Sequence, residues 1–379
     1  MHTEPRVARL FLLPRCSPRP GERCRYVPNQ MPRSKHTIFA PVYGLELGSL
    51  VNDEIRIGRV MFVSASKIPR IRKRLGLYDT VANLRAIIRN DRYELLGNAP
   101  VYAVVINLRD PEDRDIKKEL RLIKDAYWLL ASSFAYHIRR KNAALSLTTP
   151  IASNSILDTS VFGPNSFTVN NRFNAAFQPN RCDGYWKQNA ENHHFFALQK
   201  VVDKTYDVQG NWRKSIVRAA TLFGQSFLAK HLAEAFMYNM IAIETLLSVQ
   251  GDKFPSSLVD RIVALFGWMT NEDSEPWKLT IDRLYKLRCG YVHDGKHGSI
   301  TGDDLFEADT ILQNLLANVC KNTKYIRCKA DIAALSERVA AMQVLGLPIK
   351  RREKFTHGRL VKNDQIMEDY NDDSAWNSG

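Results

Sequence analysis

From Trp212 onward, apolar positions recur at alternating steps of four and three. This period places the apolar side chains on one face of an α-helix. The pattern predicts a first helix of about 35 residues that begins near Trp212. A second helix contains Ile262, and a third extends from about Pro276 to Val292.

Two more helices complete this C-terminal pattern. The fourth has Thr301 or Asp303 as its N-cap, because both residue types accept a hydrogen bond from the first turn. The fifth stops at Gly346. We therefore expect an all-α helical bundle over residues 212–345, followed by a charged, flexible tail over residues 346–379.

The N-terminal part has the shorter period of β-structure. IFAPVYGLEL and EIRIGRVMFVSA are short, β-branched and partly alternating, and PVYAVVINL is nearly continuous in apolar residues, as a buried strand would be. Residues 113–141 change to a helical period, and residues 145–211 are expected to be loops with one or two strands. The predicted fold class is an α+β domain over residues 37–211, which follows a flexible basic arm over residues 1–36 and precedes the bundle.

The composition favours a polyanionic partner. The 379-residue chain has 54 Lys and Arg against 40 Asp and Glu, which gives a formal net charge of +14. Nucleic acid is the commonest partner of so basic a chain, and a basic surface without a specific partner is the alternative. No apolar run reaches the roughly 18 residues of a membrane span, and no export signal is recognised, so we expect a cytoplasmic protein with no membrane partner.

The cysteines argue against two common kinds of site. None of the 6 cysteines belongs to a CxxC pair. A zinc ribbon and a redox motif both need such pairs. The sequence also has no Walker A loop and no dinucleotide fingerprint, and we expect no metal and no cofactor.

The segment LYKLRCGYVHDG contains Arg288 and His293, five positions apart. On a regular helix these residues are rotated by about 140° from each other. Gly290 and Gly295 weaken a helix, so we expect the helix to end or distort here and bring the two side chains together. Histidine can move a proton to or from a 2′-hydroxyl or a leaving 5′-oxygen, and arginine can clamp the phosphate. On spacing alone, however, an arginine in a surface ion pair beside a helix-capping histidine is the better explanation.

Further segments give this motif a context. AFMYNMIAIETLLS contains Glu244, RIVALFG follows it, and IDRLYKLRCGYVHDG places Tyr285 one turn before the arginine. Together with the helical region after residue 301, these segments resemble the HEPN superfamily, and specifically its Apea-like branch of prokaryotic defence proteins. That branch has an acidic residue in its first core helix and an R-x4-6-H motif in a later one. The resemblance covers residues 212–330, about a third of the chain.

The resemblance implies a bundle that pairs with a second copy, so that two motifs form one composite RNA-cleaving site. Arg288 and His293 carry over as the catalytic residues. Glu244 carries over as the partner that orients Arg288, although a purely structural ion pair explains it equally well. Tyr285 fits core packing better than chemistry.

Cys289 departs from the family pattern, because active members often have Asn, Asp or His after the arginine. A thiol is a weak hydrogen bonder, which leaves room for reduced activity or for binding without cleavage. The pair His293–Asp294 also resembles part of an HD phosphohydrolase site, but no further metal ligands complete such a site.

Two further features of the sequence are weaker signals. His193 and His194 with Cys182 are explained better as loop residues than as metal ligands. A basic run near the N-terminus is the first candidate for nucleic-acid contact, with a solvated helix face as a nearly equal alternative. Its members are Lys67, Arg70, Arg72, Lys73 and Arg74.

The expected function is a metal-independent endoribonuclease, an antiphage defence protein that cleaves RNA, with tRNA as one candidate substrate. The N-terminal domain would sense a phage-derived trigger or select the target. The second hypothesis is a non-catalytic HEPN module that binds RNA or a nucleotide, and the third is a dimerising structural subunit. The biological role comes from the family resemblance alone.

Overall fold

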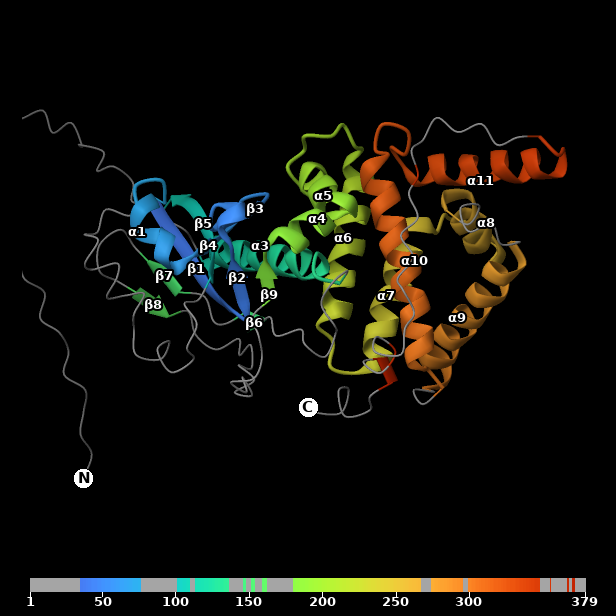
Figure 1. The fold of residues 1–379 in the computed structure, drawn as a ribbon, viewed down its shortest axis with the longest axis horizontal. Coiled ribbons are helices and arrows are strands. Elements are labelled where there is room, and N and C mark those ends of the chain that lie inside the picture. The colour runs from blue at the N-terminus through green and yellow to red at the C-terminus, as the bar shows by residue number, and fades with distance from the viewer. Residues whose placement is uncertain are drawn as a thin grey trace, which may run out of the picture. The chain divides into compact units, whose positions relative to one another are not determined.

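Most of the described residues are helical, and the strands lie in the N-terminal part of the chain (Figure 1). This agrees with the predicted order of an α+β region and then a helical region. No helix of the described part is long and apolar enough to cross a membrane. The computed structural model describes residues 35–75, 101–109, 113–135, 146–147, 151–153, 159–161, 180–266, 274–295 and 299–347, with Phe355, Met367, Tyr370 and Asn371.

A seven-stranded sheet has the order β3-β4-β5-β1-β7-β8, with β6 also pairing with β1. Every pairing in it is antiparallel. Its strands are β1 (Lys35–Tyr43), β3 (Glu54–Ile57), β4 (Val60–Ser64), β5 (Val101–Arg109), β6 (Ser146–Leu147), β7 (Ile151–Ser153) and β8 (Thr159–Val161). A separate parallel pair joins β2 (Leu45–Leu47) to β9 (Asn180–Cys182).

Strand β5 is buried on both faces, as its continuous apolar sequence predicted. Ala103 and Val105 belong to the large hydrophobic cluster that includes the helices. Tyr102 and Val104 belong to a small cluster on the other face. Since successive side chains of a strand alternate between faces, both faces need apolar residues here. The small cluster also contains Ile68 of the short helix α1 (Ile68–Ile71), which follows the 3-10 turns η1 (Ser49–Val51) and η2 (Ala65–Lys67).

The prediction of loops over residues 145–211 was wrong for two segments, which form α4 (Gly184–Asn192) and α5 (Phe195–Val202). Asp183 caps α4 by accepting a hydrogen bond from the backbone N–H of Trp186. The polar composition hid α4, because the helix buries only Trp186 and Ala190, one turn apart. The parts of 145–179 other than β6, β7 and β8 lie outside the described residues.

Two consecutive serines fasten α3 (Asp113–Ser132) to these helices. The hydroxyl of Ser132 donates to the carbonyl of Leu129 and lies 3.0 Å from Nε2 of buried His194. Because its one proton is used in this way, Nε2 of His194 is the donor to the Ser132 oxygen. In the same manner, Nε1 of Trp186 donates to Ser133 at 2.9 Å.

Helix α3 packs against α6 (Gly210–Phe227) at a point where only glycine fits. A Cβ on Gly224 would lie 1.9 Å from the carbonyl oxygen of Trp128 in α3. This close approach lets one hydrophobic cluster include Ala40 of the sheet and Leu315 of α10 (Gly302–Lys321). The segments on either side of residue 211 therefore share a core.

The single helix of about 35 residues expected from Trp212 was wrong. The segment forms two helices, α6 and α7 (Leu232–Leu247), that pack against each other. The break lies at Leu228–His231, where His231 has an extended backbone (φ −116°, ψ 131°) before α7 begins. The four-three period continued across the turn because both helices direct their apolar faces into the same core.

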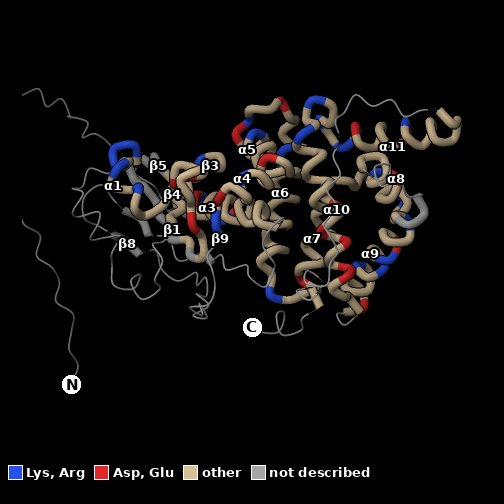
Figure 2. The backbone as a smooth tube through the Cα atoms, in the orientation of Figure 1, with Lys and Arg blue, Asp and Glu red and all other residues tan. Residues whose placement is uncertain are grey.

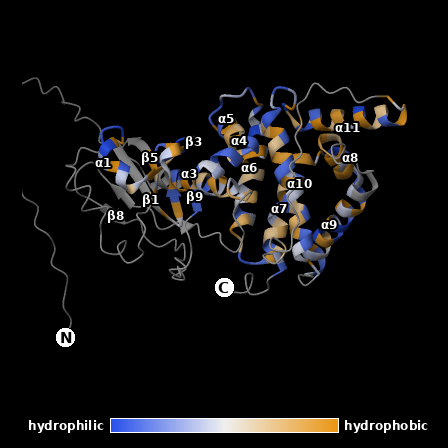
Figure 3. Cartoon of the chain, viewed as in Figure 1, coloured by the Kyte–Doolittle hydropathy of each residue, from blue (hydrophilic) through white to orange (hydrophobic). Residues whose placement is uncertain are grey.

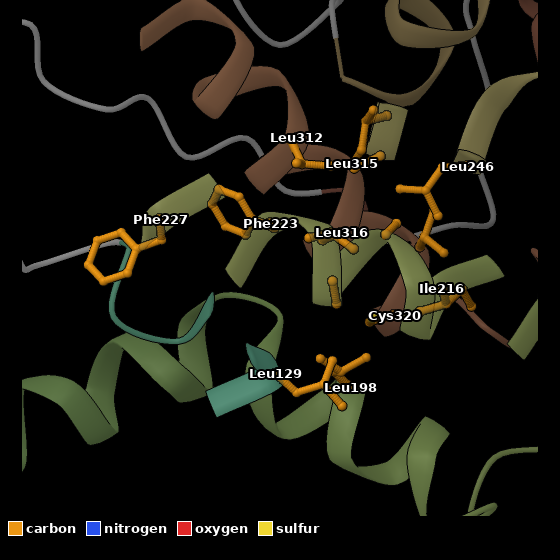
Figure 4. Close-up of a cluster of buried hydrophobic side chains, with 14 of the residues drawn as sticks. Leu129, Leu198, Ile216, Phe223, Phe227, Leu246, Leu312, Leu315, Leu316 and Cys320 are labelled. Atoms are coloured by element: carbon orange, nitrogen blue, oxygen red, sulfur yellow. The ribbon is translucent and has the colours of Figure 1, made fainter. Parts of the chain in front are cut away.

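Helix α10 runs through the centre of the helical region, and nearly all of its residues are buried. Side chains from α3, α5, α6 and α7 meet those of α10 in Figure 4, which shows Leu129, Leu198, Phe223, Leu246 and Leu315 among others. Thr301 is the N-cap of α10, as predicted, and forms a capping box with Asp304.

Two further helices complete the region, α8 (Ser256–Leu265) and α11 (Lys329–Val344). They pack against each other, and α11 buries Ile332, Leu335 and Val339. The C-terminal end of α11 exposes Val344 and is coloured hydrophobic in Figure 3.

The prediction of a flexible tail over residues 346–379 was wrong for three of its residues. Phe355 and Tyr370 are buried, and Met367 packs against the core cluster. The hydroxyl of Tyr370 donates to buried Asp309 at 2.6 Å, and its ring meets Phe306 edge-on. Tyr370 therefore finds a surface on α10 that the charged composition of the tail does not indicate. Gly346, Leu347 and Asn371 are also described. The other residues of the tail lie outside the described part, as does the basic arm before Lys35.

Candidate functional site

Helix α9 (Ser274–Asp294) carries both residues of the predicted catalytic pair, and it continues through Gly290. The expected helix end lies at Gly295, which follows the last helical residue with φ +64°, and the expected distortion at Gly290 was wrong. The cost of one glycine is about 1 kcal/mol, which buried apolar neighbours such as Ile281 and Leu284 offset by packing.

Arg288 faces α7 and pairs with Glu244. Its Nη2 donates to Oε2 of Glu244 at 3.1 Å, and its Nε lies 2.9 Å from Oε1. The second approach lacks the alignment of a hydrogen bond, so it counts as an ion pair only. The two side chains are 23% and 20% exposed, so the guanidinium is held in place and still reaches the surface.

His293 lies on a different face of α9. Because the helix is continuous, the five-residue step turns His293 by about 140° from Arg288. His293 is exposed, and it lines an open surface groove that Arg288 does not line. A single chain therefore does not bring the two side chains to one point.

The groove has a volume of about 710 Å³ and follows α9 along its length. A stripe of five lining residues repeats the four-three step of one helix face: Leu279, Arg283, Lys286, Gly290 and His293. Sequence reasoning missed Arg283 and Lys286, although this spacing relative to His293 was visible in the sequence. A mixed apolar and charged stripe does not stand out in a search for apolar periodicity.

Tyr285, Cys289 and Asp294 also line the groove. The Tyr285 ring stacks on Phe254 with a centroid distance of 5.6 Å and an angle of 6°. Burial, then Cys289 and Glu244, raise the pKa of the Tyr285 hydroxyl. Tyr285 thus lies between the Glu244–Arg288 pair and the groove, and it contacts the groove in addition to packing against the core. Asp294 is exposed at the last residue of the helix.

Arg283 is the second arginine of α9 that a carboxylate from another helix holds. Its Nη2 lies 3.3 Å from Oδ1 of Asp304 in α10, where the arginine is 52% and the aspartate 3% exposed. Oδ2 of the same carboxylate accepts hydrogen bonds from the backbone N–H and the hydroxyl of Thr301. The capping box of α10 therefore places a buried carboxylate beside Arg283, and the contact is an ion pair without a hydrogen bond.

The predicted basic run around α1 is partly engaged within the protein. Lys67 and Arg74 both pair with Glu54, at 2.9 and 2.5 Å. Burial of Glu54 acts to raise its pKa, but these two cations hold the pKa below its ordinary value. Arg72 donates to the carbonyl of Pro69 at 3.2 Å. Arg70 and Lys73 are exposed, so they are the members most open to a phosphate; the run is blue beside α1 in Figure 2.

The histidine pair is structural. His194 is fully buried between Ser132 and the ring of Phe223. Burial, with smaller effects of His193 and Lys321, lowers its pKa to about 3. Among the described residues, no group of three or more His, Cys, Asp and Glu could hold a metal ion.

No protein-family model, curated protein or solved structure matches the chain.

Proposed function

We propose that the protein is a metal-independent endoribonuclease whose active site needs Arg288 and His293 from two copies of the chain. The observation that carries the proposal is the contrast between the two side chains on α9. Arg288 is held by Glu244 at the rim of the bundle, and His293 stands exposed on the last turn of the helix. The first arrangement suits a phosphate clamp, and the second suits a group that exchanges protons.

The chemistry follows from these two groups. His293 takes the proton of a ribose 2′-hydroxyl, whose oxygen attacks the adjacent phosphorus. Arg288 of the partner subunit stabilises the negative charge that builds on the phosphate oxygens. The bond to the 5′-oxygen breaks, this oxygen takes a proton from water, and His293 returns its own proton to the solvent. The products are a 2′,3′-cyclic phosphate and a 5′-hydroxyl end, and DNA is not cleaved because it lacks the nucleophile.

Two copies are needed because of the 140° rotation along α9. Val292 lies near Arg288 on the helix and is 50% exposed, which offers apolar surface to a second copy. The resemblance to Apea-like HEPN proteins supports the same arrangement. It also supports, by analogy only, a role in antiphage defence with a phage-derived trigger.

Cleavage of RNA in EDTA tests the chemistry. The wild type should cleave, and Arg288→Ala and His293→Ala should each lower the rate by about a hundredfold or more. Unchanged cleavage in both variants would overturn the assignment.

A mixture of the two variants tests the need for two copies. In a mixed dimer, one copy supplies Arg288 and the other supplies His293, so one site is intact. Mixing should restore up to about a quarter of the wild-type activity if the subunits exchange freely. This test applies once the wild type is shown to cleave RNA and the two variants are shown to exchange subunits. If the mixture is then still inactive, the site is not shared between copies.

A second candidate function is an RNA-binding module that does not cleave. The separation of Arg288 from His293 in one chain favours it, as does Cys289 beside the arginine. RNA binding by the wild type without any cleavage would support this alternative. Absence of salt-dependent RNA binding would instead favour a structural subunit.

A further inference from the structure

The stripe on α9 forms a line of cations that leads to His293. Arg283 and Lys286 lie on the same helix face as His293 and line the same groove. At a rise of 1.5 Å per residue, Lys286 is about 10.5 Å and Arg283 about 15 Å from His293 along the helix. These distances are too long for the phosphate at His293 itself, and they suit phosphates further along a strand.

The stripe is open between its cations and His293. Gly290 lies at this point, and a Cβ built on it would have no neighbouring atom within 4 Å. Lys286 is exposed, and Arg283 is half exposed while its guanidinium is held by Asp304. Arg283 therefore lies beside a carboxylate and still keeps exposed donors that an anion can reach.

The lining of the groove also includes two acidic residues and an aromatic one. Asp282 and Asp294 line it, but neither belongs to the five-residue stripe. Tyr285 adds an aromatic side chain to the lining, and the Phe254 ring stacked on it is 39% exposed. Phosphate contacts beside an aromatic surface are typical of single-stranded nucleic-acid binding.

We propose that the groove along α9 binds single-stranded RNA, with Arg283 and Lys286 contacting phosphates beyond the one at His293. The inference rests on the proposed function, because it treats His293 as the point where the strand is cut. The two cations act as substrate-positioning residues. They hold the strand in register along α9, and they take no part in proton transfer.

The experiment measures the affinity for a fluorescein-labelled oligouridylate as a function of salt concentration. All variants carry His293→Ala, so that the probe stays intact. Each phosphate contact contributes about 0.7 to the salt slope for a single strand, so Arg283→Ala with Lys286→Ala should lower the slope by about 1.4. Asp282→Asn should strengthen binding, because it removes a negative charge from the groove.

Lys278→Ala is the matched control. Lys278 is an exposed cation on α9 that does not line the groove, so its loss should leave the slope unchanged. The single variant Lys286→Gln is included because it should fold like the wild type, since Lys286 makes no ion pair among the described residues. It should lower the slope by about 0.7. An unchanged slope in the folded Lys286→Gln variant, or an equal loss in Lys278→Ala, would overturn the inference.

The two proposals fail in different ways. If the wild type binds RNA through the groove but does not cleave it, RNA binding along α9 is supported and the proposed ribonuclease activity is wrong. If cleavage needs His293 but RNA binding does not depend on Arg283 and Lys286, only the proposed binding of RNA along α9 is wrong.

Discussion

Glu244 on α7 and Arg288 on α9 form a half-buried ion pair in which one carboxylate faces two nitrogens of the guanidinium. The pair connects two helices through residues that are 44 positions apart in the sequence. It also leaves Nη1 of Arg288 without a protein partner among the described residues. An arginine arranged in this way is positioned for an anion and keeps donors for it.

Glu244→Gln should reduce RNA cleavage while the protein stays folded. The amide cannot hold the guanidinium as the carboxylate does, and a misplaced clamp costs about ten- to a hundredfold in kcat. The unfolding free energy should change by only about 1 kcal/mol, because the pair is partly exposed. Cleavage kinetics and urea unfolding measure the two effects.

Glu234→Gln is the control for that prediction. Glu234 also lies on α7, but its carboxylate accepts from the Tyr238 hydroxyl at 2.8 Å. This variant should keep full activity. If Glu244→Gln cleaves RNA as fast as the wild type while Arg288→Ala does not, Glu244 has no positioning role.

Gly290→Ala should stabilise the protein by about 1 kcal/mol, because alanine favours a helix interior and the added methyl group meets open space. Gly224→Ala should destabilise it by about 3 kcal/mol or more, because its Cβ would collide with the Trp128 carbonyl. Urea unfolding of both variants provides the measurement. A loss of stability in Gly290→Ala would mean that α9 does break at this residue.

Acid should destabilise the protein through His194. Its pKa is about 3 in the folded chain, lowered mainly by burial, and near 6.5 when exposed. Between these values the unfolded state binds more protons, so the stability present above pH 6.5 is lost as the pH falls. One such histidine contributes a slope of about 1.4 kcal/mol per pH unit.

His194→Gln isolates this contribution, since glutamine keeps a donor for Ser132 without a titratable ring. Unfolding free energies between pH 6.5 and 5 should fall less steeply for the variant than for the wild type. Parallel pH profiles would show that His194 does not titrate in this way.

Tyr370→Phe should lower the unfolding free energy by about 2 kcal/mol, because buried Asp309 loses one hydrogen-bond donor. Tyr325→Phe is the control, since Tyr325 is 40% exposed and should tolerate the change. Equal stabilities of the two variants would show that the hydrogen bond from Tyr370 to Asp309 does not stabilise the fold.

The sequence by itself determined most of the helices and the principal strands, and it narrowed the N-cap of α10 to Thr301 or Asp303. These features depend on local periodicity and capping, which neighbouring residues decide. It also pointed to Glu244, Arg288 and His293, but only through the resemblance to HEPN proteins, because their spacing alone did not favour a site.

Only the tertiary structure decided how these parts are arranged. It divided the long helix at Leu228–His231 and carried α9 through Gly290, because packing energy outweighs the propensity of one residue. It set Arg288 against α7 and His293 in the groove, and it added Arg283, held by Asp304. Such relations join residues far apart in the sequence, and no local pattern contains them.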